Sequence, residues 1–183
     1  NLSLPEDNLT QDIFGVKVRL FGDLIYDTLP QVSLGIEYKK QNDFLIPSLV
    51  GAKRDSDVEG YLTASRLLMG AAFGCNVVLN GGVRYSRENE TGLLGFGGDR
   101  RDTRSLLKEG SVAVLFNPRW ALGVEYREKP DNLSFAGESD WADVFVGYFP
   151  NKHLSVVLAY AKLGEIATLD DQNGAYLSIQ GSF

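Results

Sequence analysis

Residues 32–39 read VSLGIEYK, and apolar side chains occupy every second position of this stretch. The intervening positions carry small or charged residues, namely Ser33, Gly35, Glu37 and Lys39. A period of two places successive side chains on opposite faces of an extended chain. The stretch therefore predicts a β-strand with one apolar face and one small or charged face.

The same alternating pattern recurs later in the chain. Residues 77–85 (VVLNGGVRY), 120–127 (WALGVEYR) and 154–161 (LSVVLAYA) alternate in the same way and also reach a tyrosine near their ends. Five noisier segments alternate over residues 14–20, 61–67, 111–116, 142–148 and 176–183. We therefore predict an all-β antiparallel fold, with nine strands visible and no helix.

Composition narrows the class of protein. The chain has 183 residues, enough for a single domain over residues 1–183. It carries 24 acidic against 18 basic residues, which argues against nucleic acid as a partner. Its one cysteine and one histidine form no cluster with carboxylates at metal-ligand spacing. The sequence thus predicts no catalytic residues, no metal, no cofactor and no enzyme activity.

Connections between the predicted strands are short at one end and long at the other. The long ones cover residues 41–57, 88–103, 128–139 and 164–173, and they are rich in polar residues and glycine. Transmembrane barrels have short periplasmic turns and longer outer loops. The pattern therefore favours an antiparallel transmembrane β-barrel.

A soluble ligand-binding barrel also alternates, with its apolar face inward. Three features favour the membrane. The less apolar face holds many small residues, and aromatic residues recur at both ends of the strands, as bilayer interfaces select. The last strand ends in Phe183, which resembles the C-terminal signal of bacterial outer-membrane proteins. We therefore expect a location in the bacterial outer membrane, with lipid and the barrel-insertion machinery as partners.

Strand number carries a further expectation. If Phe183 lies at the periplasmic end, nine antiparallel strands place Asn1 on the outer side. Bacterial single-chain barrels have an even strand number. We therefore expect that this domain lacks an odd number of N-terminal strands, with twelve strands in the complete protein.

Three motifs resemble an uncharacterised proteobacterial family that is labelled only as a domain of unknown function. They are GFGGDRRD at residues 95–102, EYREKPDN at 125–132 and FPNKHLS at 149–155. The resemblance covers essentially the whole chain and implies an exported barrel with additional N-terminal segments. It implies no activity and no catalytic residues.

The FGGD stretch at residues 96–99 also resembles the constriction loop of general porins, which folds into the lumen. Here it would place both signs of charge in such a loop, at Asp99, Arg100, Arg101, Asp102 and Arg104. An ordinary outer loop is the alternative, because glycines recur in turns of any kind.

Charged residues on the less apolar face of the strands are expected to line the lumen. They are Lys17, Arg19, Glu37, Lys39, Arg66, Arg84, Glu109, Glu125, Arg127 and Asp143. In a water-filled pore some would remain unpaired, whereas a closed plug would pair nearly all of them. The first hypothesis is a porin-like channel or passive transporter for small polar solutes. The alternative is a closed structural or assembly barrel that binds a partner through its loops.

Overall fold

The computed structural model describes residues 9–135, 137, 139–166 and 169–181. These residues form one nine-stranded sheet and very little helix. The strands are β1 (Gln11–Phe21), β2 (Gln31–Gln41), β3 (Ser56–Ala72), β4 (Cys75–Ser86), β5 (Ser105–Asn117), β6 (Trp120–Arg127), β7 (Trp141–Asn151), β8 (Leu154–Ile166) and β9 (Leu169–Gly181). The helical pieces are α1 (Leu45–Leu49) and the 3₁₀ turn η1 (Glu90–Gly92).

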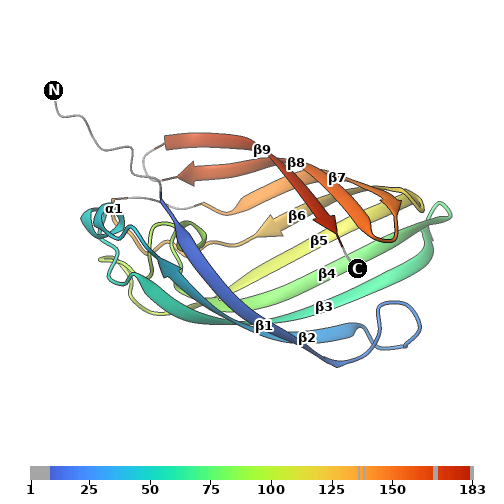
Figure 1. Ribbon diagram of the computed structural model, residues 1–183, viewed down its shortest axis with the longest axis horizontal. Coiled ribbons are helices and arrows are strands. Elements are labelled where there is room, and N and C mark those ends of the chain that lie inside the picture. The colour runs from blue at the N-terminus through green and yellow to red at the C-terminus, as the bar shows by residue number, and fades with distance from the viewer. Residues whose placement is uncertain (1–8, 136, 138, 167–168, 182–183) are drawn as a thin grey trace.

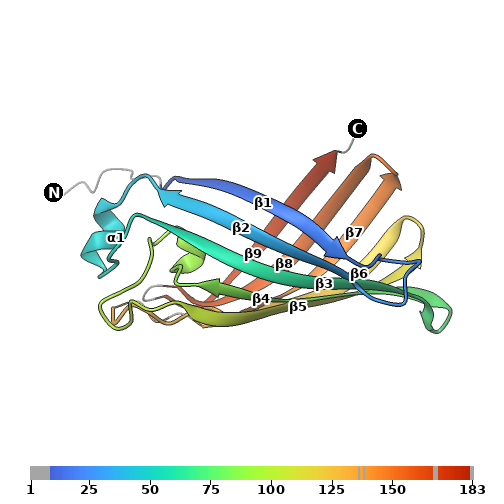
Figure 2. The ribbon, with the colours of Figure 1, turned by 90° about the horizontal axis from the view of Figure 1, so that it is seen from below.

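Each strand pairs antiparallel with its sequence neighbours, so the spatial order is β1 to β9. The sheet curls strongly, and its two edge strands face each other across an open side (Figures 1 and 2). Among the described residues β1 and β9 do not pair, so the sheet is not closed. The predicted all-β antiparallel architecture is confirmed, whereas the complete strand number and the membrane location remain predictions.

Two sequence expectations about the loops are wrong. Residues 164–173 are not a long loop, because β8 and β9 continue as a hairpin in which Gly164 pairs with Gln172 and Ile166 with Leu169. Two register shifts accommodate this polar, glycine-containing stretch within the ladder. The five-residue α1, in the loop between β2 and β3, was not expected either.

The two faces of the sheet have opposite characters. On β2, Ser33, Gly35 and Lys39 are buried, whereas Leu34 and Ile36 between them are exposed. The same alternation on the other strands places large apolar side chains on the convex face. The concave face therefore carries the small and charged side chains, and these side chains are the buried ones.

The cluster of buried apolar residues lies in the loops rather than in the sheet. Ala52, Leu94 and Leu133 form it, with Leu9 and Phe44 among the partly buried residues against it. It joins the loops that follow β2, β4 and β6 at one end of the sheet. Backbone bridges from Phe96 to Arg54 and Glu88 extend the same loop assembly.

Candidate functional site on the concave face

The loop between β4 and β5, residues 87–104, folds back over the concave face; we call it the inner loop. Its Glu88 is only 2% exposed and accepts from Lys39 Nζ and from Arg127 Nη2, both at 2.6 Å. Lys39 lies on β2 and Arg127 on β6, so three strands separate the two partners of one carboxylate. The inner loop thus bridges the concave face from β2 to β6.

Arg84, on β4, is the centre of the same network. Its guanidinium donates to Glu59 on β3, and lies 3.4 Å from carboxylate oxygens of both Glu37 and Glu109. It also stacks over the Tyr61 ring, 4.9 Å from the centroid. We call Lys39, Glu59, Arg84, Glu88 and Arg127 the ion-paired region. All three of its cations are paired, as buried charges require.

Asparagine side chains hold the inner loop in its folded-back shape. Asn89 Nδ2 donates to the carbonyl oxygens of Leu94 (3.3 Å) and Gly97 (2.9 Å), and Asn132 Nδ2 donates to Asn89 Oδ1 at 2.9 Å. Both asparagines are fully buried. Gly97 has φ of 62°, in the left-handed region that favours glycine.

The residues predicted for a constriction loop lie at the rim instead of over the concave face. Arg100 pairs with Asp131, Asp102 with Arg54, and Asp99 accepts from Ser134. The other two donate to neighbouring oxygens: Arg101 Nε to Thr103 Oγ1 and Arg104 Nη2 to Asp57 Oδ1. Charge does enter the concavity from this loop, but it is carried by Glu88.

The same rim contacts move the pKa values of the loop carboxylates. The hydrogen bond from Arg54 holds the pKa of Asp102 below its ordinary 3.8, aided by the charges of Arg54 and Arg87. Hydrogen bonds from Ser134 lower the pKa of Asp99. Both carboxylates therefore favour the ionised form, which tethers the inner loop to its neighbours.

Nine of the ten residues predicted to line the lumen fall into three groups. Five of them meet on the concave face at the loop end: Glu37, Lys39, Arg84, Glu109 and Arg127. Lys17 and Arg19 share that face in register with Gly35 and Ser33, but they lie on β1, at the uncovered edge of the sheet. Glu125 and Asp143 form the third group.

Arg66 is a correction. Ser65 Oγ donates to Asn80 Oδ1 at 2.7 Å, and this pairing turns Thr63 and Ser65 toward the concave face. Arg66 consequently points to the other side, where it donates to the carbonyl of Thr28. The alternation predicted for residues 61–67 is confirmed, but its two faces are reversed: Tyr61 shares the face of Arg84, and Arg66 the face of Leu79.

Glu125 and Asp143 sit directly opposite each other on β6 and β7; we call them the acidic pair. Asp143 is 8% exposed, and its Oδ1 has no hydrogen-bond partner among the described residues. Both carboxylates line a cavity of about 610 Å³ over β6 to β9. No ion pair joins either carboxylate to a described Lys or Arg.

Sequence reasoning missed two residues of the ion-paired region. Glu59 belongs to the alternation of Tyr61 and Thr63, so a correct facing of β3 would have placed it inward. Glu88 stands just after β4, in a segment with no periodic signal. Its position depends on contacts with β2 and β6 that a local pattern does not contain.

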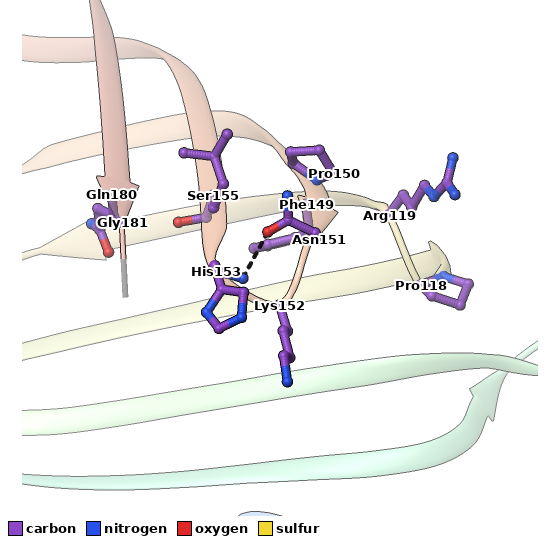
Figure 3. A pocket seen from close by; sticks show the side chains of 11 residues that line it. Pro118, Arg119, Phe149, Pro150, Asn151, Lys152, His153, Ser155, Gln180 and Gly181 are labelled. Atoms are coloured by element: carbon purple, nitrogen blue, oxygen red, sulfur yellow. Dashed lines mark hydrogen bonds between the residues drawn. The ribbon is translucent and has the colours of Figure 1, made fainter. Parts of the chain in front are cut away.

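A second hollow, of about 640 Å³, lies among the short turns at the opposite end (Figure 3). One of its polar side chains serves the turn: Asn151 Oδ1 accepts from the His153 backbone at 2.8 Å. Figure 3 shows Arg119 and Lys152 pointing away from one another. Among the described residues that line the hollow, these two cations therefore do not converge on a common point.

Over the described part of the chain, no three His, Cys, Asp or Glu side chains gather in a way that would hold a metal ion. Within the same residues no helix is long and apolar enough to cross a membrane.

The protein is thus an all-β protein built on one curved antiparallel sheet with a charged concave face. It belongs to the family described as protein of unknown function (DUF3034), whose family model matches residues 1–180. Neither the curated proteins nor the solved structures contain a match to this chain.

Proposed function

We propose that this protein is a β-barrel of the bacterial outer membrane that forms a narrow channel for small polar solutes. The inner loop closes its loop end. The observation that carries the proposal is that the two faces of the sheet are reversed relative to those of a water-soluble barrel. Charge is inside the curved sheet and apolar surface is outside, which suits lipid as the surrounding solvent.

Every strand places exposed apolar side chains on the convex face, where Arg66 and Lys162 also lie. Ile36 is 56% exposed, Val124 52% and Leu158 56%; they pair in register with Val16, Val144 and Val146, respectively. Water-soluble monomers rarely expose contiguous apolar surface on this scale. A hydrocarbon environment removes the cost of hydrating that surface.

Aromatic side chains support the same placement. Tyr38, Tyr85, Tyr126 and Tyr160 are exposed near the loop ends of β2, β4, β6 and β8. Phe73, Phe116 and Trp120 are exposed at the short-turn end. Two such belts match the two interfaces of a bilayer, where a tyrosine keeps its ring in lipid and its hydroxyl in water.

The proposal includes closure of the sheet. β1 and β9 run in the same direction, so an all-antiparallel barrel needs an odd number of additional strands between them. Three such strands would give twelve. Phe183, through which the insertion machinery would recognise the chain, lies outside the described residues.

A channel is favoured over a filled barrel because the ion pairs that Glu88 makes with the sheet reach from β2 to β6. Beyond β6, the concave face of β8 carries small side chains such as Ala159 and Ala161 beside the 610 Å³ cavity. The second candidate is a closed structural barrel. It is supported by the full pairing of Lys39, Arg84 and Arg127.

Membrane insertion is tested on the full-length protein with two lysine variants. Val124→Lys places a charge on the convex face, with an expected destabilisation of about 2–4 kcal/mol if the site lies near the bilayer midplane. Tyr26→Lys places the same charge in the connection between β1 and β2, where the side chain is 90% exposed, and should be tolerated. Heat-modifiable gel mobility and membrane fractionation measure the outcome. A wild-type protein that stays monomeric and soluble without detergent would reject the membrane barrel.

Recordings in planar bilayers then separate the two functions. A channel gives reproducible single-channel steps, and opening of the inner loop should increase their size. An inserted protein without such steps would favour the closed structural barrel.

A further inference from the structure

We propose that a groove on the convex face of β2, β3 and β4 binds one phosphorylated lipid of the surrounding membrane. One acyl chain would lie in the groove, and the phosphate would contact Arg104 at its loop end. The inference rests on the proposed membrane location, but it does not require that the barrel conducts.

A glycine opens this groove. Gly60 lies between Ile36 and Tyr85 in the ladder, and Val58 is the next residue toward the loops on the same face of β3. A Cβ added at Gly60 would meet only the carbonyl oxygen of Gly35, at 3.9 Å. The missing side chain therefore leaves a hollow of about 250 Å³ among its neighbours.

The walls of the groove are apolar and outward-facing. Ile36, Val58 and Tyr85 line it, and Val58 is 46% and Tyr85 54% exposed. The volume is smaller than that of complete small-molecule sites, roughly 300–1,000 Å³, so the groove suits a section of a single acyl chain. Because Tyr85 belongs to the aromatic belt, the loop end of the groove lies at the level of the lipid headgroups.

Arg104 lines the loop end of the groove and has a donor to spare. Its Nη2 donates to Asp57 Oδ1 at 2.6 Å and to the carbonyl oxygen of Val58 at 3.0 Å, which fixes the guanidinium beside the groove. Its Nη1 makes no hydrogen bond to a described residue and retains accessible surface, in a side chain that is 31% exposed. This nitrogen is therefore available to an oxygen of a lipid phosphate.

The ion pairs around Arg104 leave an excess of positive charge. Three guanidinium groups share two carboxylates: Arg87 and Arg104 pair with Asp57, whereas Arg54 pairs with Asp102, which lies 3.9 Å from Arg87. A phosphate would supply the missing negative charge, and arginine binds phosphate oxygens through charge-assisted hydrogen bonds.

The groove and the excess charge together indicate an amphiphilic ligand. A free phosphate would use Arg104 but leave the apolar groove empty. A neutral lipid would fill the groove but leave the positive charge unmatched. A phosphorylated lipid satisfies both parts of the site at once.

Native mass spectrometry of the full-length protein in detergent tests the site. The probe is dilauroyl phosphatidate, and the matched probe is dilauroylglycerol, which has the same chains and no phosphate. We expect one phosphatidate to bind saturably and about tenfold more tightly than dilauroylglycerol, as one charge-assisted hydrogen bond would provide. Inorganic phosphate in excess should not displace it.

Two variants examine the charge. Arg104→Gln should weaken phosphatidate binding about tenfold and leave dilauroylglycerol binding unchanged. Lys162→Gln removes a cation from the convex side of β8 and should change neither affinity.

Two further variants examine the groove. Gly60→Leu fills it and should weaken the binding of both lipids. Gly81→Leu is the matched control, because a Cβ at Gly81 meets nothing within 4 Å and this residue does not line the groove. Heat-modifiable mobility confirms that each variant is folded.

Unchanged phosphatidate binding in either Arg104→Gln or Gly60→Leu would overturn the inference. Displacement by inorganic phosphate would show an adventitious anion only, and an equal loss in Lys162→Gln would show general charge attraction; either result would reject the site. A protein that stays soluble without detergent would reject the membrane barrel itself. An inserted barrel that binds no phosphatidate would reject only this site.

Discussion

Two neighbouring regions of the concave face differ in how their charges are paired. In the ion-paired region every cation is matched, and Glu88 of the inner loop supplies the shared carboxylate. In the acidic pair, neither carboxylate forms an ion pair with a described Lys or Arg. β6 belongs to both regions, with Arg127 in one and Glu125 two residues away in the other. On β6, the inner loop therefore supplies the ion-pair partner of Arg127.

The largest effect should come from removing the shared carboxylate. Glu88→Gln leaves buried Lys39 with one fewer partner and Arg127 with none of its present ion pairs. We expect a loss of about 3–5 kcal/mol in the free energy of unfolding. Urea unfolding in detergent measures the change.

The matched control is Lys108→Gln, because this side chain is 75% exposed and its pair with Glu128 is 3.8 Å long. It should change stability by less than about 0.5 kcal/mol. Equal effects of the two variants would show that the inner loop does not stabilise the sheet.

An intermediate effect is expected where Tyr61 borders the ion-paired region. A Cβ added at Gly35 would overlap the Tyr61 ring, which lies beneath Arg84. Gly35→Ala should therefore cost about 1–3 kcal/mol through overpacking. Gly81→Ala on the convex face meets nothing within 4 Å and should be neutral or stabilising by about 0.4–1 kcal/mol. Equal changes in melting temperature for Gly35→Ala and Gly81→Ala would contradict the expected difference between the two faces.

The acidic pair should respond with the opposite sign to the ion-paired region. Asp143→Asn removes one of two directly opposed carboxylates and breaks no ion pair. We expect stability to rise by about 0.2–1 kcal/mol. A clear loss of stability in the same unfolding assay would mean that Asp143 already has a stabilising partner.

The smallest effect is expected when the pH is lowered, at the carboxylates that join the inner loop to its neighbours. The pKa of Asp102 is lowered on folding, so its contribution to stability is present above its ordinary pKa of 3.8 and is lost as pH falls through the lower folded value. Hydrogen exchange across residues 87–104 should therefore accelerate below about pH 3.8. In Asp102→Asn the exchange should already be faster at neutral pH, and its acid dependence should be reduced. The same acid response in both proteins would assign the effect to another carboxylate, such as Asp99.

Much of the sheet could be predicted from period-two patterns, because strand alternation is a local property. The nine predicted segments overlap β1 to β9, and the faces of β2 and β6 were assigned correctly. β3 was misassigned because Tyr61 suits either face. The polar composition of residues 164–173 predicted a loop, because a local pattern does not show that the two halves of this stretch pair with each other.

The candidate site was less predictable. Glu37, Lys39 and Arg84 were identified because they lie within regular strands. Glu88 was missed, since its position comes from contacts with β2 and β6 that are distant in the sequence. Asp99 and Arg100 were predicted to lie in a constriction loop because they are in or next to the FGGD motif. Their partners are instead Ser134 and Asp131 in the next long loop.

The position of Glu88 also has a mechanical meaning. Ladder hydrogen bonds fix the separation of neighbouring strands, but they leave the bending of the whole sheet comparatively soft. The two hydrogen bonds of Glu88 link β2 to β6, which the ladder does not connect directly. They therefore restrain the distance between these two strands across the concave face. The width of the sheet at this level is thus limited by the reach of one glutamate side chain.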